Sequence, residues 1–374
     1  MVEKYIYDVA VIGAGPMGSF VAEQLALGGL KVVILEKDLT PGDTTVCSGA
    51  MHIDVVKFID LPQNVIEKAL CNCRLVTNGH IDDWSFPNYI YMLTNRQQVD
   101  RFLSKRAQSA GSTLLTQALV THVNPKQEEL FYQNGMTKDL KMIKAKIFIF
   151  ADGPHSLASK IFHTKSIKTH KFFWIGIEYE IEFNDHPMDR VEIVTNPKTL
   201  PFGYYWILPK MSSISIGLGR FNMIDGPPLW DILDEFVQTK QEFKGKRILK
   251  RKGGIIPGRI NPILQKDNCL IIGDAAGMTN PFTGGGYVCG FLSAKIAAKT
   301  CLKAFKKKKF QPKILHSYER TLRRSKYYLG IRLAHYTLCL LLFLYQKTNQ
   351  SLYPLFIRFY FYVSHTLMRY IKVI

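Results

Sequence analysis

Residues 5–18 read YIYDVAVIGAGPMG, a β-branched apolar run that leads directly into a GxGxxG pattern. A run of this kind is typical of a buried parallel strand. An apolar helical stretch follows from Ser19 to Leu27 and ends at two glycines, and residues 31–35 (KVVIL) predict a second strand with Glu36 at its end. The order of strand, glycine turn, helix and strand predicts a βαβ unit.

The glycines of this turn have distinct physical roles. Gly13 permits the tight turn, Gly15 lets the backbone approach a pyrophosphate, and Gly18 lets the helix pack closely on the strand. The helix N-terminus offers N–H groups and a positive dipole end to that pyrophosphate. Glu36 is placed to accept hydrogen bonds from a ribose and to repel a 2′-phosphate. A GxGxxG pattern alone is weak evidence, but with all these elements in register it predicts a dinucleotide site.

The charge of the chain is strongly positive. Its 374 residues carry 49 Lys and Arg against 30 Asp and Glu, a formal net charge of +19. Either a general composition bias or an anionic partner, nucleic acid or a membrane surface, would explain this excess. Between Lys299 and Arg332 there are twelve basic residues and one acid, Glu319. Seven cysteines without a disulfide-framework spacing, and a chain that begins at once with a strand, indicate a reduced cytosolic protein without a secretory signal.

The middle of the chain predicts further strands around a helix. A helix is expected over residues 97–110, a strand over 114–123, and a hairpin with its turn at 134–135. Residues 145–150 (AKIFIF) read as another buried strand, whereas residues 52–95 have too little pattern for an assignment.

Two later stretches add a second sheet and a second cofactor contact. Residues 172–219 are aromatic and β-rich, which predicts a sheet with one apolar face. Residues 268–293 contain a buried strand, then Gly273-Asp274, and after three glycines a helix from about Tyr287. An Asp at a strand end can bind a hydroxyl, and a helix N-terminus can stabilise negative charge. This block therefore predicts a further contact with the same cofactor.

These blocks, together with Asp152-Gly153 and in this order and spacing, resemble the flavoprotein monooxygenases and reductases of the para-hydroxybenzoate hydroxylase type. Within that group the chain looks most like the geranylgeranyl reductases, including the digeranylgeranylglycerophospholipid reductases. The most specific match is residues 201–209 (PFGYYWILP), which resemble the substrate motif PxxYxWxFP with Leu208 in place of Phe.

Two further matches support the resemblance. Residues 47–50 (CSGA) resemble a Cys-Gly segment beside the flavin, with Ser48 where Gly is usual. Residues 273–286 resemble a GDAAG…P…GGG segment closely. The resemblance covers roughly residues 5–330.

The resemblance implies FAD as the cofactor and an isoprenoid lipid as the substrate. The residues that it assigns to FAD are Gly13, Gly15, Pro16, Met17, Gly18, Glu36, Lys37, Cys47, Ser48, Ala50, Arg96, Val120, Asp152, Gly153, Gly273, Asp274, Gly285, Gly286 and Tyr287. Those that it assigns to the substrate are Pro201, Tyr204, Trp206 and Pro209. Cys47 is the candidate for proton donation or relay, and no metal site is expected. The electron donor, NAD(P)H or ferredoxin, stays open.

The implied reaction is the reduction of isolated C=C bonds. Nothing polarises such an alkene, so the protein must hold it against the reduced flavin in a dry, apolar slot. The aromatic residues suited to wall such a slot, each of which could equally be ordinary sheet core, are Phe172, Phe173, Phe202, Tyr204, Tyr205 and Trp206.

Other functions fit the same fold. One alternative is an FAD-dependent monooxygenase or a quinone or lipid oxidoreductase, and another is a non-catalytic prenyl-lipid binder. The intact glycine blocks oppose the non-catalytic binder, and the substrate motif favours the reductase. A nucleic-acid partner is not expected.

The C-terminal region has the pattern of a membrane-surface anchor. Residues 333–345 are apolar for about 13 residues, whereas a span needs roughly 20. Residues 351–368 are rich in aromatics but contain Pro354, Arg358 and His365. With the basic stretch before them, these residues predict a cytoplasmic protein that lies peripherally on the inner face of the cell membrane. The alternative is that both segments are helices packed on the substrate domain.

The sequence thus predicts an α/β fold, with a Rossmann-like FAD-binding domain, an inserted β-rich substrate domain and a C-terminal helical region. The expected bounds are 1–165 and 250–300 for the discontinuous FAD-binding domain, 166–249 for the substrate domain and 301–374 for the helical region.

Overall fold

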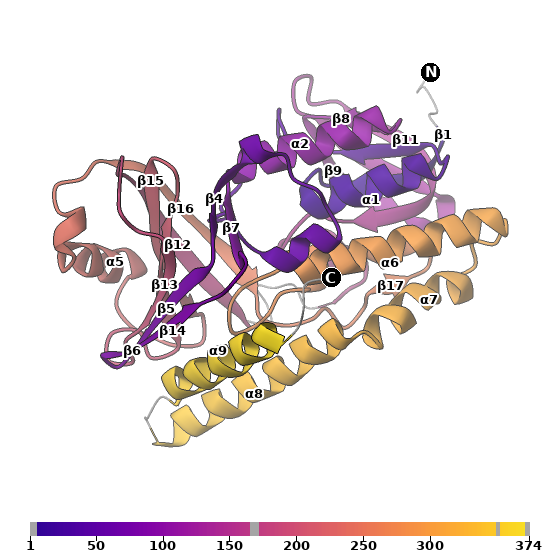
Figure 1. Cartoon of the computed structure of the whole chain (residues 1–374). Coiled ribbons are helices and arrows are strands. Elements are labelled where there is room, and N and C mark those ends of the chain that lie inside the picture. The colour runs from indigo at the N-terminus through magenta and orange to yellow at the C-terminus, as the bar shows by residue number, and fades with distance from the viewer. Residues whose placement is uncertain (1–5, 165–171, 349–351, 371–374) are drawn as a thin grey trace. The chain divides into compact units, whose positions relative to one another are not determined.

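The computed structural model describes residues 6–164, 172–348 and 352–370 (Figure 1). Tyr5 and Ser351, which begin two of the predicted segments, lie outside these ranges. The chain divides into two compact units. The first unit holds residues 1–45, 96–171 and 257–333, and the second holds residues 46–95, 172–256 and 334–374.

The first unit is built on a mainly parallel sheet. Its described strands number eight, in the order β17-β18-β11-β1-β2-β8, with β10 and β9 attached beside β11. The strands are β1 (Ile6–Ile12), β2 (Val32–Leu35), β8 (Thr113–Leu115), β9 (Ala118–Asn124), β10 (Glu129–Asn134), β11 (Leu140–Phe150), β17 (Gln265–Lys266) and β18 (Cys269–Ile271). β1 pairs in parallel with both β2 and β11. Val9 and Val11 of β1 are fully buried, as expected for a central parallel strand.

The first unit also contains several helices. They are α1 (Pro16–Leu27), α2 (Arg96–Ser109), α3 (Ala158–Ile161), α6 (Tyr287–Lys306) and α7 (Pro312–Arg323), with the 3₁₀ helices η3 (Pro125–Gln127) and η5 (Gly273–Ala276). α1 packs against α2 and α6, and the rings of Phe20 and Phe291 meet edge to face at 5.2 Å. The buried hydroxyl of Tyr318 in α7 donates to the carbonyl of Ile271 at 2.6 Å, which ties α7 to the end of β18. The predicted βαβ unit is therefore confirmed.

Two of the predicted strands have different limits. The strand predicted over 114–123 is divided into β8 and β9, because Gln117 between them has a φ of 51°, which a continuous strand does not allow. The predicted hairpin is confirmed as β10 and β11, which pair antiparallel. β11 then continues without a break into the buried strand predicted over 145–150, so one strand serves both.

The second unit contains two sheets among its described residues. A seven-stranded sheet has the order β16-β12-β15-β14-β13-β5-β6, and a three-stranded sheet has the order β3-β7-β4. The strands are β3 (Ala50–His52), β4 (Ile66–Leu70), β5 (Asn72–Thr77), β6 (His80–Ser85), β7 (Tyr91–Thr94), β12 (Phe173–Glu182), β13 (Arg190–Thr195), β14 (Gly203–Pro209), β15 (Ser213–Phe221) and β16 (Ile248–Pro257, whose last residue falls in the first unit). The 3₁₀ helices are η1 (Ile53–Lys57), η2 (Gln63–Val65) and η4 (Gln241–Phe243).

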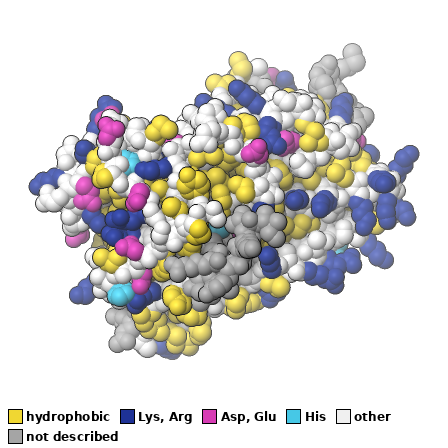
Figure 2. Space-filling view, viewed as in Figure 1, with side chains coloured by type: hydrophobic (Ala, Val, Ile, Leu, Met, Phe, Trp, Pro, Cys, Tyr) yellow, Lys and Arg dark blue, Asp and Glu magenta, His cyan; other side chains and the backbone are white. Residues whose placement is uncertain are grey.

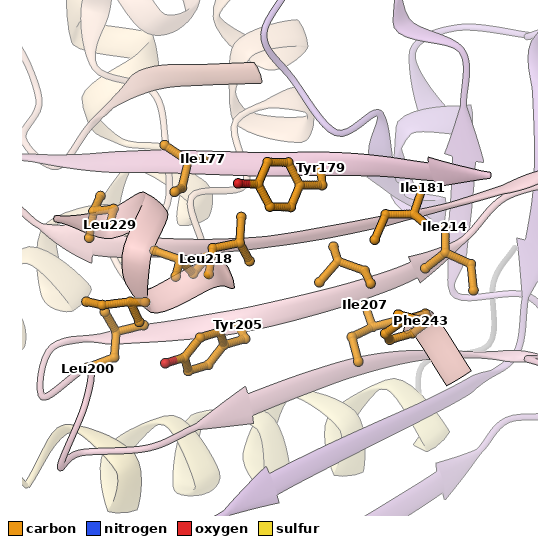
Figure 3. Close-up of a cluster of buried hydrophobic side chains, with 13 residues drawn as sticks. Ile177, Tyr179, Ile181, Leu200, Tyr205, Ile207, Ile214, Leu218, Leu229 and Phe243 are labelled. Carbon is orange, nitrogen blue, oxygen red and sulfur yellow. The ribbon is translucent and has the colours of Figure 1, made fainter. Parts of the chain in front are cut away.

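One face of the seven-stranded sheet is closed by α5 (Leu229–Gln238). Alternate residues of β12, β14 and β15, including Tyr179, Tyr205 and Leu218, point into a cluster with Leu229 of α5 (Figure 3). The ring of Tyr205 stacks on that of Phe236 at 4.1 Å. This cluster is the hydrophobic core of the second unit.

The opposite face is aromatic. Because side chains alternate along a strand, Trp174 of β12 and Tyr204 and Trp206 of β14 lie on the side away from α5. We call these three residues the aromatic face. The ring centroids of Trp174 and Tyr204, and of Tyr204 and Trp206, are 5.9 Å apart. Trp174 also lies 5.9 Å from the ring of Tyr353, which is fully buried.

Two C-terminal helices, α8 (Lys326–Thr348) and α9 (Tyr353–Tyr370), complete the described chain (Figure 1). Arg358 of α9 donates to Asp82 of β6 at 2.7 Å and 3.1 Å, and Phe202 next to β14 meets the rings of Tyr345 and Tyr353 at 5.2 Å and 5.3 Å. α9 and the end of α8 therefore pack on the seven-stranded sheet.

The two units divide the chain differently from the predicted domain bounds. Residues 46–95, expected in the FAD-binding domain, cluster with the β-rich unit, because β5 pairs in parallel with β13. Residues 301–333 cluster with the first unit and residues 334–374 with the second, so the C-terminal region is shared between them.

Candidate functional site

The predicted cofactor residues of the first unit meet at one edge of its sheet. Gly13 follows β1, Glu36 follows β2, Asp152 follows β11 and Asp274 follows β18. These four strands run parallel, so their carboxyl ends lie at the same edge. Open α/β sheets bind ligands in the crevice outside this edge.

The glycine turn contains two structural glycines and one that faces open space. A Cβ on Gly13, which has a φ of 97°, would lie 2.6 Å from the carbonyl oxygen of Ala151, and a Cβ on Gly18 would lie 2.0 Å from that of Gly13. A Cβ on Gly15 would meet no atom within 4 Å. Gly15 is also the N-cap of α1, and no side chain caps that helix. Space beside an uncapped helix N-terminus fits a phosphate group.

Glu36 is bound to the turn by its own carboxylate. It is 8% exposed, and its Oε2 accepts from the N–H of Ala14 at 2.7 Å and its Oε1 from that of Asp38 at 3.0 Å. Each carboxylate oxygen has capacity for another donor, so a ribose hydroxyl fits here. The Lys37 ammonium is instead bound by Asp38 and Thr44 at 2.7 Å and 2.8 Å.

Val120 lies in β9, which follows the end of β2. The N–H of Ala118 donates to the carbonyl of Glu36 at 2.7 Å, so β9 begins beside the predicted ribose contact. Val120 is 9% exposed, and its backbone is the group that the prediction assigns to an adenine.

Asp152 has a buried oxygen that lacks a partner in the described part of the chain. Its Oδ2 accepts from the N–H of Leu157 at 2.7 Å, whereas its Oδ1 is buried and has no hydrogen bond. Burial outweighs the opposing effect of Ser156 and nearby N–H groups and raises the pKa of Asp152 to about 6. Next to it, Gly153 has a φ of 76° and open space where a Cβ would be. This arrangement fits a ligand that brings a hydroxyl or N–H donor.

Asp274 and the N-terminus of α6 form the other side of the site. The N-cap Gly286 has no side-chain cap, and a Cβ on it would lie 3.1 Å from Oδ1 of Asp274. Burial raises the pKa of Asp274, and the charge of Arg96 opposes this. Arg96 donates to Asp100 at 2.6 Å and its guanidinium lies 5.6 Å from the centre of the Tyr287 ring.

Gly273, Gly290 and Met17 have packing roles. A Cβ on Gly273, which has a φ of 60°, would lie 2.9 Å from the Met17 side chain, and a Cβ on Gly290 would lie 2.7 Å from it. Met17 therefore fills the space between α1, η5 and α6, and its backbone N–H is the group left to face a pyrophosphate. Pro16 has no N–H to offer. The N–H of Gly285 donates to the Thr283 hydroxyl at 3.3 Å.

A cavity of about 180 Å³ lies beside Asp274 within the first unit. It is lined by Ser156, Arg259 and Asn261 among others. These three residues could not be identified from the sequence, because they lie in loops that meet only in the fold. Among the described residues no group of three or more His, Cys, Asp or Glu is arranged to hold a metal ion.

The Cys47 segment lies in the second unit. The N–H of Gly49 donates to the Cys47 sulfur at 3.4 Å, and the hydroxyl of Thr94 donates to the carbonyl of Gly49 at 2.8 Å. Gly49 has a φ of 82°, and a Cβ there would lie 2.1 Å from the carbonyl oxygen of Thr94. These contacts fix the turn that carries Cys47 and Ser48 ahead of Ala50, the first residue of β3.

The predicted substrate motif lies on β14, and its residues separate onto two faces. Tyr204 and Trp206 belong to the aromatic face, whereas Tyr205 belongs to the core under α5. Pro201 precedes β14 and Pro209 ends it. Burial raises the pKa of the Tyr204 hydroxyl. Of the predicted slot residues, Tyr205 is therefore ordinary core.

The motif did not single out Trp174, which belongs to the aromatic face, or Tyr353 and Tyr91, which lie near it. Trp174 and Tyr353 contact each other as described above. Burial, and then nearby Cys73, Tyr360 and Tyr204, raise the pKa of the Tyr91 hydroxyl. Alternation along β12 could have identified Trp174, but nothing local in the sequence links Tyr91 or Tyr353 to β14.

Comparison with known proteins matches the chain over nearly its whole length. The family described as Lycopene cyclase protein matches residues 8–358. A relative named digeranylgeranylglycerophospholipid reductase 1, from Methanosphaera stadtmanae, is 28% identical over 329 residues, which are 83% of this chain and 79% of the relative. The predicted resemblance to the geranylgeranyl reductases is confirmed by this relative.

Solved structures share the fold. A geranylgeranyl bacteriochlorophyll reductase-like protein from Thermoplasma acidophilum has a TM-score of 0.79 at 21% identity and covers 88% of this chain and 87% of its own. A variant of the halogenase PltM in complex with FAD has a TM-score of 0.68 at 16% identity and covers 84% of this chain and 73% of its own. The predicted α/β fold is confirmed.

Proposed function

The chain belongs to the lycopene cyclase protein family, and on this premise we propose that it is an FAD-dependent reductase that saturates C=C bonds of isoprenoid chains in lipid biosynthesis. The observation that carries the proposal is that β14 places Tyr204 and Trp206 on the aromatic face. It is supported by a relative that matches 83% of this chain and is named a digeranylgeranylglycerophospholipid reductase. FAD supplies, when reduced, the hydride that such a reaction needs.

The first unit offers the groups that would hold FAD. The N–H groups at the start of α1 and the space beside Gly15 suit the pyrophosphate. Glu36 suits the adenosine ribose. Asp274 and the buried Oδ1 of Asp152 are acceptors for hydroxyl or N–H donors, and the N-terminus of α6 would stabilise negative charge on the reduced ring. Arg96 would complement the anionic phosphates.

The second unit offers the groups that would hold the substrate. Tyr204, Trp206 and Trp174 present an apolar surface on which an alkene can be ordered and kept from water. Excluding water matters because an isolated C=C bond gives the protein nothing polar to bind. The main contributions of these residues are therefore to position the alkene and to exclude water from it.

Reduction also needs a proton on the carbon that does not receive the hydride. Cys47 is our candidate donor or relay. Its sulfur accepts a hydrogen bond from the N–H of Gly49 at 3.4 Å, and Cys47 is partly exposed, so the thiol is oriented and reachable.

The test is a single-turnover experiment on the FAD-loaded protein. The flavin is reduced without oxygen, prenyl lipids are added, and the products are weighed by mass spectrometry. A gain of hydrogen pairs supports the proposal. An unchanged mass with changed chromatographic retention would instead indicate cyclisation, and a gain of oxygen on aerobic repetition would indicate a monooxygenase. A protein that takes up no FAD would indicate a lipid binder. NAD(P)H and reduced ferredoxin are compared as the source of electrons.

We also propose that the protein lies on the cytoplasmic surface of a membrane, from which a prenyl lipid would enter. α8 is longer than the predicted apolar segment and, by length and composition, could cross a membrane. One side of it, with Tyr328, Ile331 and Leu338, is buried in the protein. Packing on one side favours a helix that lies on the surface over one that spans.

The other side of α8 supports this proposal. Apolar residues more than half exposed recur there at spacings of four and three, and α9 continues the pattern; we call them the apolar stripe, which comprises Leu329, Leu333, Tyr336, Leu340, Phe343, Leu355, Phe359 and Tyr362. Exposed Lys326 and Arg332 lie in the first two turns of α8, and exposed Lys347 lies in its last turn. Figure 2 shows hydrophobic side chains over α8, and Lys and Arg gathered where α6 ends and α7 begins. Apolar side chains flanked by cations suit an anionic bilayer surface.

A further inference from the structure

The indole ring of Trp206 packs against three glycines, Gly176, Gly217 and Gly219. A Cβ on Gly217 of β15 would lie 2.3 Å from the Trp206 ring, and a Cβ on Gly176 or Gly219 would lie 3.6 Å from it. The indole therefore lies flat against β15 and β12, because side chains are absent where the ring needs room. Gly217 cannot be replaced without moving the ring, whereas Gly219 leaves space for one methyl group between Trp206 and Trp174.

The edge of the same indole is bound to a buried carboxylate. Nε1 of Trp206 donates to Oε2 of Glu178 at 3.3 Å, and Glu178 is 2% exposed. Oε1 of Glu178 accepts from the Lys252 ammonium at 3.2 Å. A buried carboxylate is costly unless it is paired, so Lys252 is what allows Glu178 to stand beside an indole inside the protein.

Lys252 is in turn part of a wider charge cluster. Its ammonium lies 3.5 Å from Glu180, which accepts from the Ser213 hydroxyl at 3.2 Å and lies 3.9 Å from Lys210. Burial opposes the charge of Lys252, but Glu178 and Glu180 outweigh it and raise the pKa of its ammonium. The Lys252 ammonium therefore stays charged at neutral pH. The cluster extends away from the aromatic face on the same side of the sheet.

We propose that Trp206 determines how far a prenyl chain extends along the aromatic face, and that Glu178, held by Lys252, is the positioning residue that fixes its indole. The inference rests on the proposed function and adds the residues that set chain-length selectivity. The three glycines fix the plane of the Trp206 ring, and the hydrogen bond to Glu178 fixes the rotation of the indole in that plane. Together they give the face a rigid boundary.

The test compares two double variants that both remove the buried ion pair. Glu178→Gln with Lys252→Met keeps an oxygen that can accept from the indole. Glu178→Leu with Lys252→Met removes the acceptor. Any general loss of stability or charge is shared by both, so a difference between them isolates the hydrogen bond to Trp206. Gly219→Ala is the third variant, because it adds one methyl group beside the ring at ordinary contact distance.

Two measurements are made on the FAD-loaded proteins. The first is ¹⁹F NMR of protein labelled with 5-fluorotryptophan, in which the chain gives four resonances and Trp206→Phe assigns one of them. The second is the ratio of kcat/KM for farnesyl and geranylgeranyl lipids. We expect the Gln–Met variant to keep the wild-type Trp206 resonance and ratio. The Leu–Met variant should shift or broaden that resonance and change the ratio by about fivefold, as one lost hydrogen bond implies.

Gly219→Ala should move the same ratio while the hydrogen bond stays intact. The proposal is overturned if the two double variants give the same resonance and the same ratio, or if the resonance moves and the ratio does not. If the wild-type protein reduces no prenyl chain, the proposed function fails instead, while the NMR comparison still decides whether Glu178 positions Trp206.

Discussion

Substitutions of single glycines in the turn after β1 should distinguish FAD binding from folding. Gly15 has open space where a Cβ would be, whereas a Cβ on Gly18 would lie 2.0 Å from a backbone oxygen. We expect Gly15→Val to fold normally but to purify without FAD, because the branched side chain occupies the place of the pyrophosphate. The measurement is the flavin absorbance per mole of protein.

Gly18→Ala is the matched comparison. It should lower the free energy of unfolding by about 1–3 kcal/mol, because the added methyl group is forced into a packed region. A Gly15→Val protein that keeps one FAD per chain would rule out the proposed pyrophosphate site.

Cys47 offers a second test at the scale of one residue. If its thiol donates or relays the proton, Cys47→Ala should slow turnover about 10²–10⁴-fold, the usual contribution of a general acid, while FAD stays bound. Stopped-flow oxidation of the reduced flavin by substrate measures this step. Cys47→Ser, which keeps a hydroxyl, should recover part of the rate. Unchanged turnover in Cys47→Ala would leave the residue with a packing role only.

Asp152 predicts a pH dependence of stability. Its folded pKa is raised to about 6, above the value of an unfolded Asp, so the folded state prefers the protonated form. The stability that this preference gives is complete below pH 4 and is lost as the pH rises through about 6. In flavin-free protein, Asp152→Asn should therefore gain about 2 kcal/mol relative to wild type between pH 4 and pH 7. Urea unfolding at the two pH values measures the difference; a gap that does not widen with pH contradicts the assignment.

At the scale of elements, local signals in the sequence predicted what is local in the fold. The βαβ unit, α2 and the β10–β11 hairpin depend on periodicity and turn residues that neighbours in the sequence supply. The division into β8 and β9 escaped prediction because it depends on the unusual φ of Gln117, a residue type with no preference for that conformation.

Residues 46–95 escaped prediction for a different reason. β5 is placed by its parallel pairing with β13, more than a hundred residues later along the chain, and no local pattern encodes that partner. The candidate site divides in the same way. Motifs marked Gly15, Glu36, Asp274 and Trp206, whereas Glu178 and Lys252 were missed because their roles exist only once β12 and β16 lie side by side.

One polar contact that joins α9 to β6 can be tested. Arg358 donates to both oxygens of Asp82, and also contacts His80, with Arg358 40% and Asp82 21% exposed. Because the pair is partly exposed, Arg358→Met should cost about 1 kcal/mol or less in global stability. It should nonetheless speed chymotrypsin cleavage within α9, at Phe359 or Tyr362, because a terminal helix opens locally.

Arg101→Met is the control for that experiment. It removes a comparable exposed ion pair, with Asp43 at 3.0 Å, from the first unit. Equal cleavage of α9 in both variants would show that the Arg358 contact does not hold the helix.

At the scale of the whole molecule, the net charge of +19 and the exposed apolar stripe have one explanation in common. Each Lys or Arg near an anionic surface contributes about 1 kcal/mol, and each buried Leu or Phe about 1.5–3 kcal/mol. The charges alone would give binding that salt removes. The stripe alone would invite aggregation. Together they predict reversible binding to anionic membranes that weakens with salt but is not abolished by it.

The experiment that separates the apolar from the electrostatic contribution to membrane binding uses two double variants that add the same number of acids. Leu333→Glu with Leu340→Glu places two acids in the apolar stripe, and Met136→Glu with Leu140→Glu places two acids on exposed apolar positions of the β10–β11 hairpin, so net charge changes equally. In co-sedimentation with anionic vesicles at moderate salt, the stripe variant should bind at least tenfold more weakly, since two apolar insertions are lost. The hairpin variant should lose only the part of the binding that charge accounts for.

An equal loss of binding in both variants would show that the interaction is nonspecific electrostatics. Binding that resists carbonate extraction would indicate that α8 crosses the bilayer. With FAD content and activity on detergent-solubilised substrate unchanged in both variants, a selective loss at the stripe would place the membrane contact on α8 and α9, the helices whose buried sides pack on the protein.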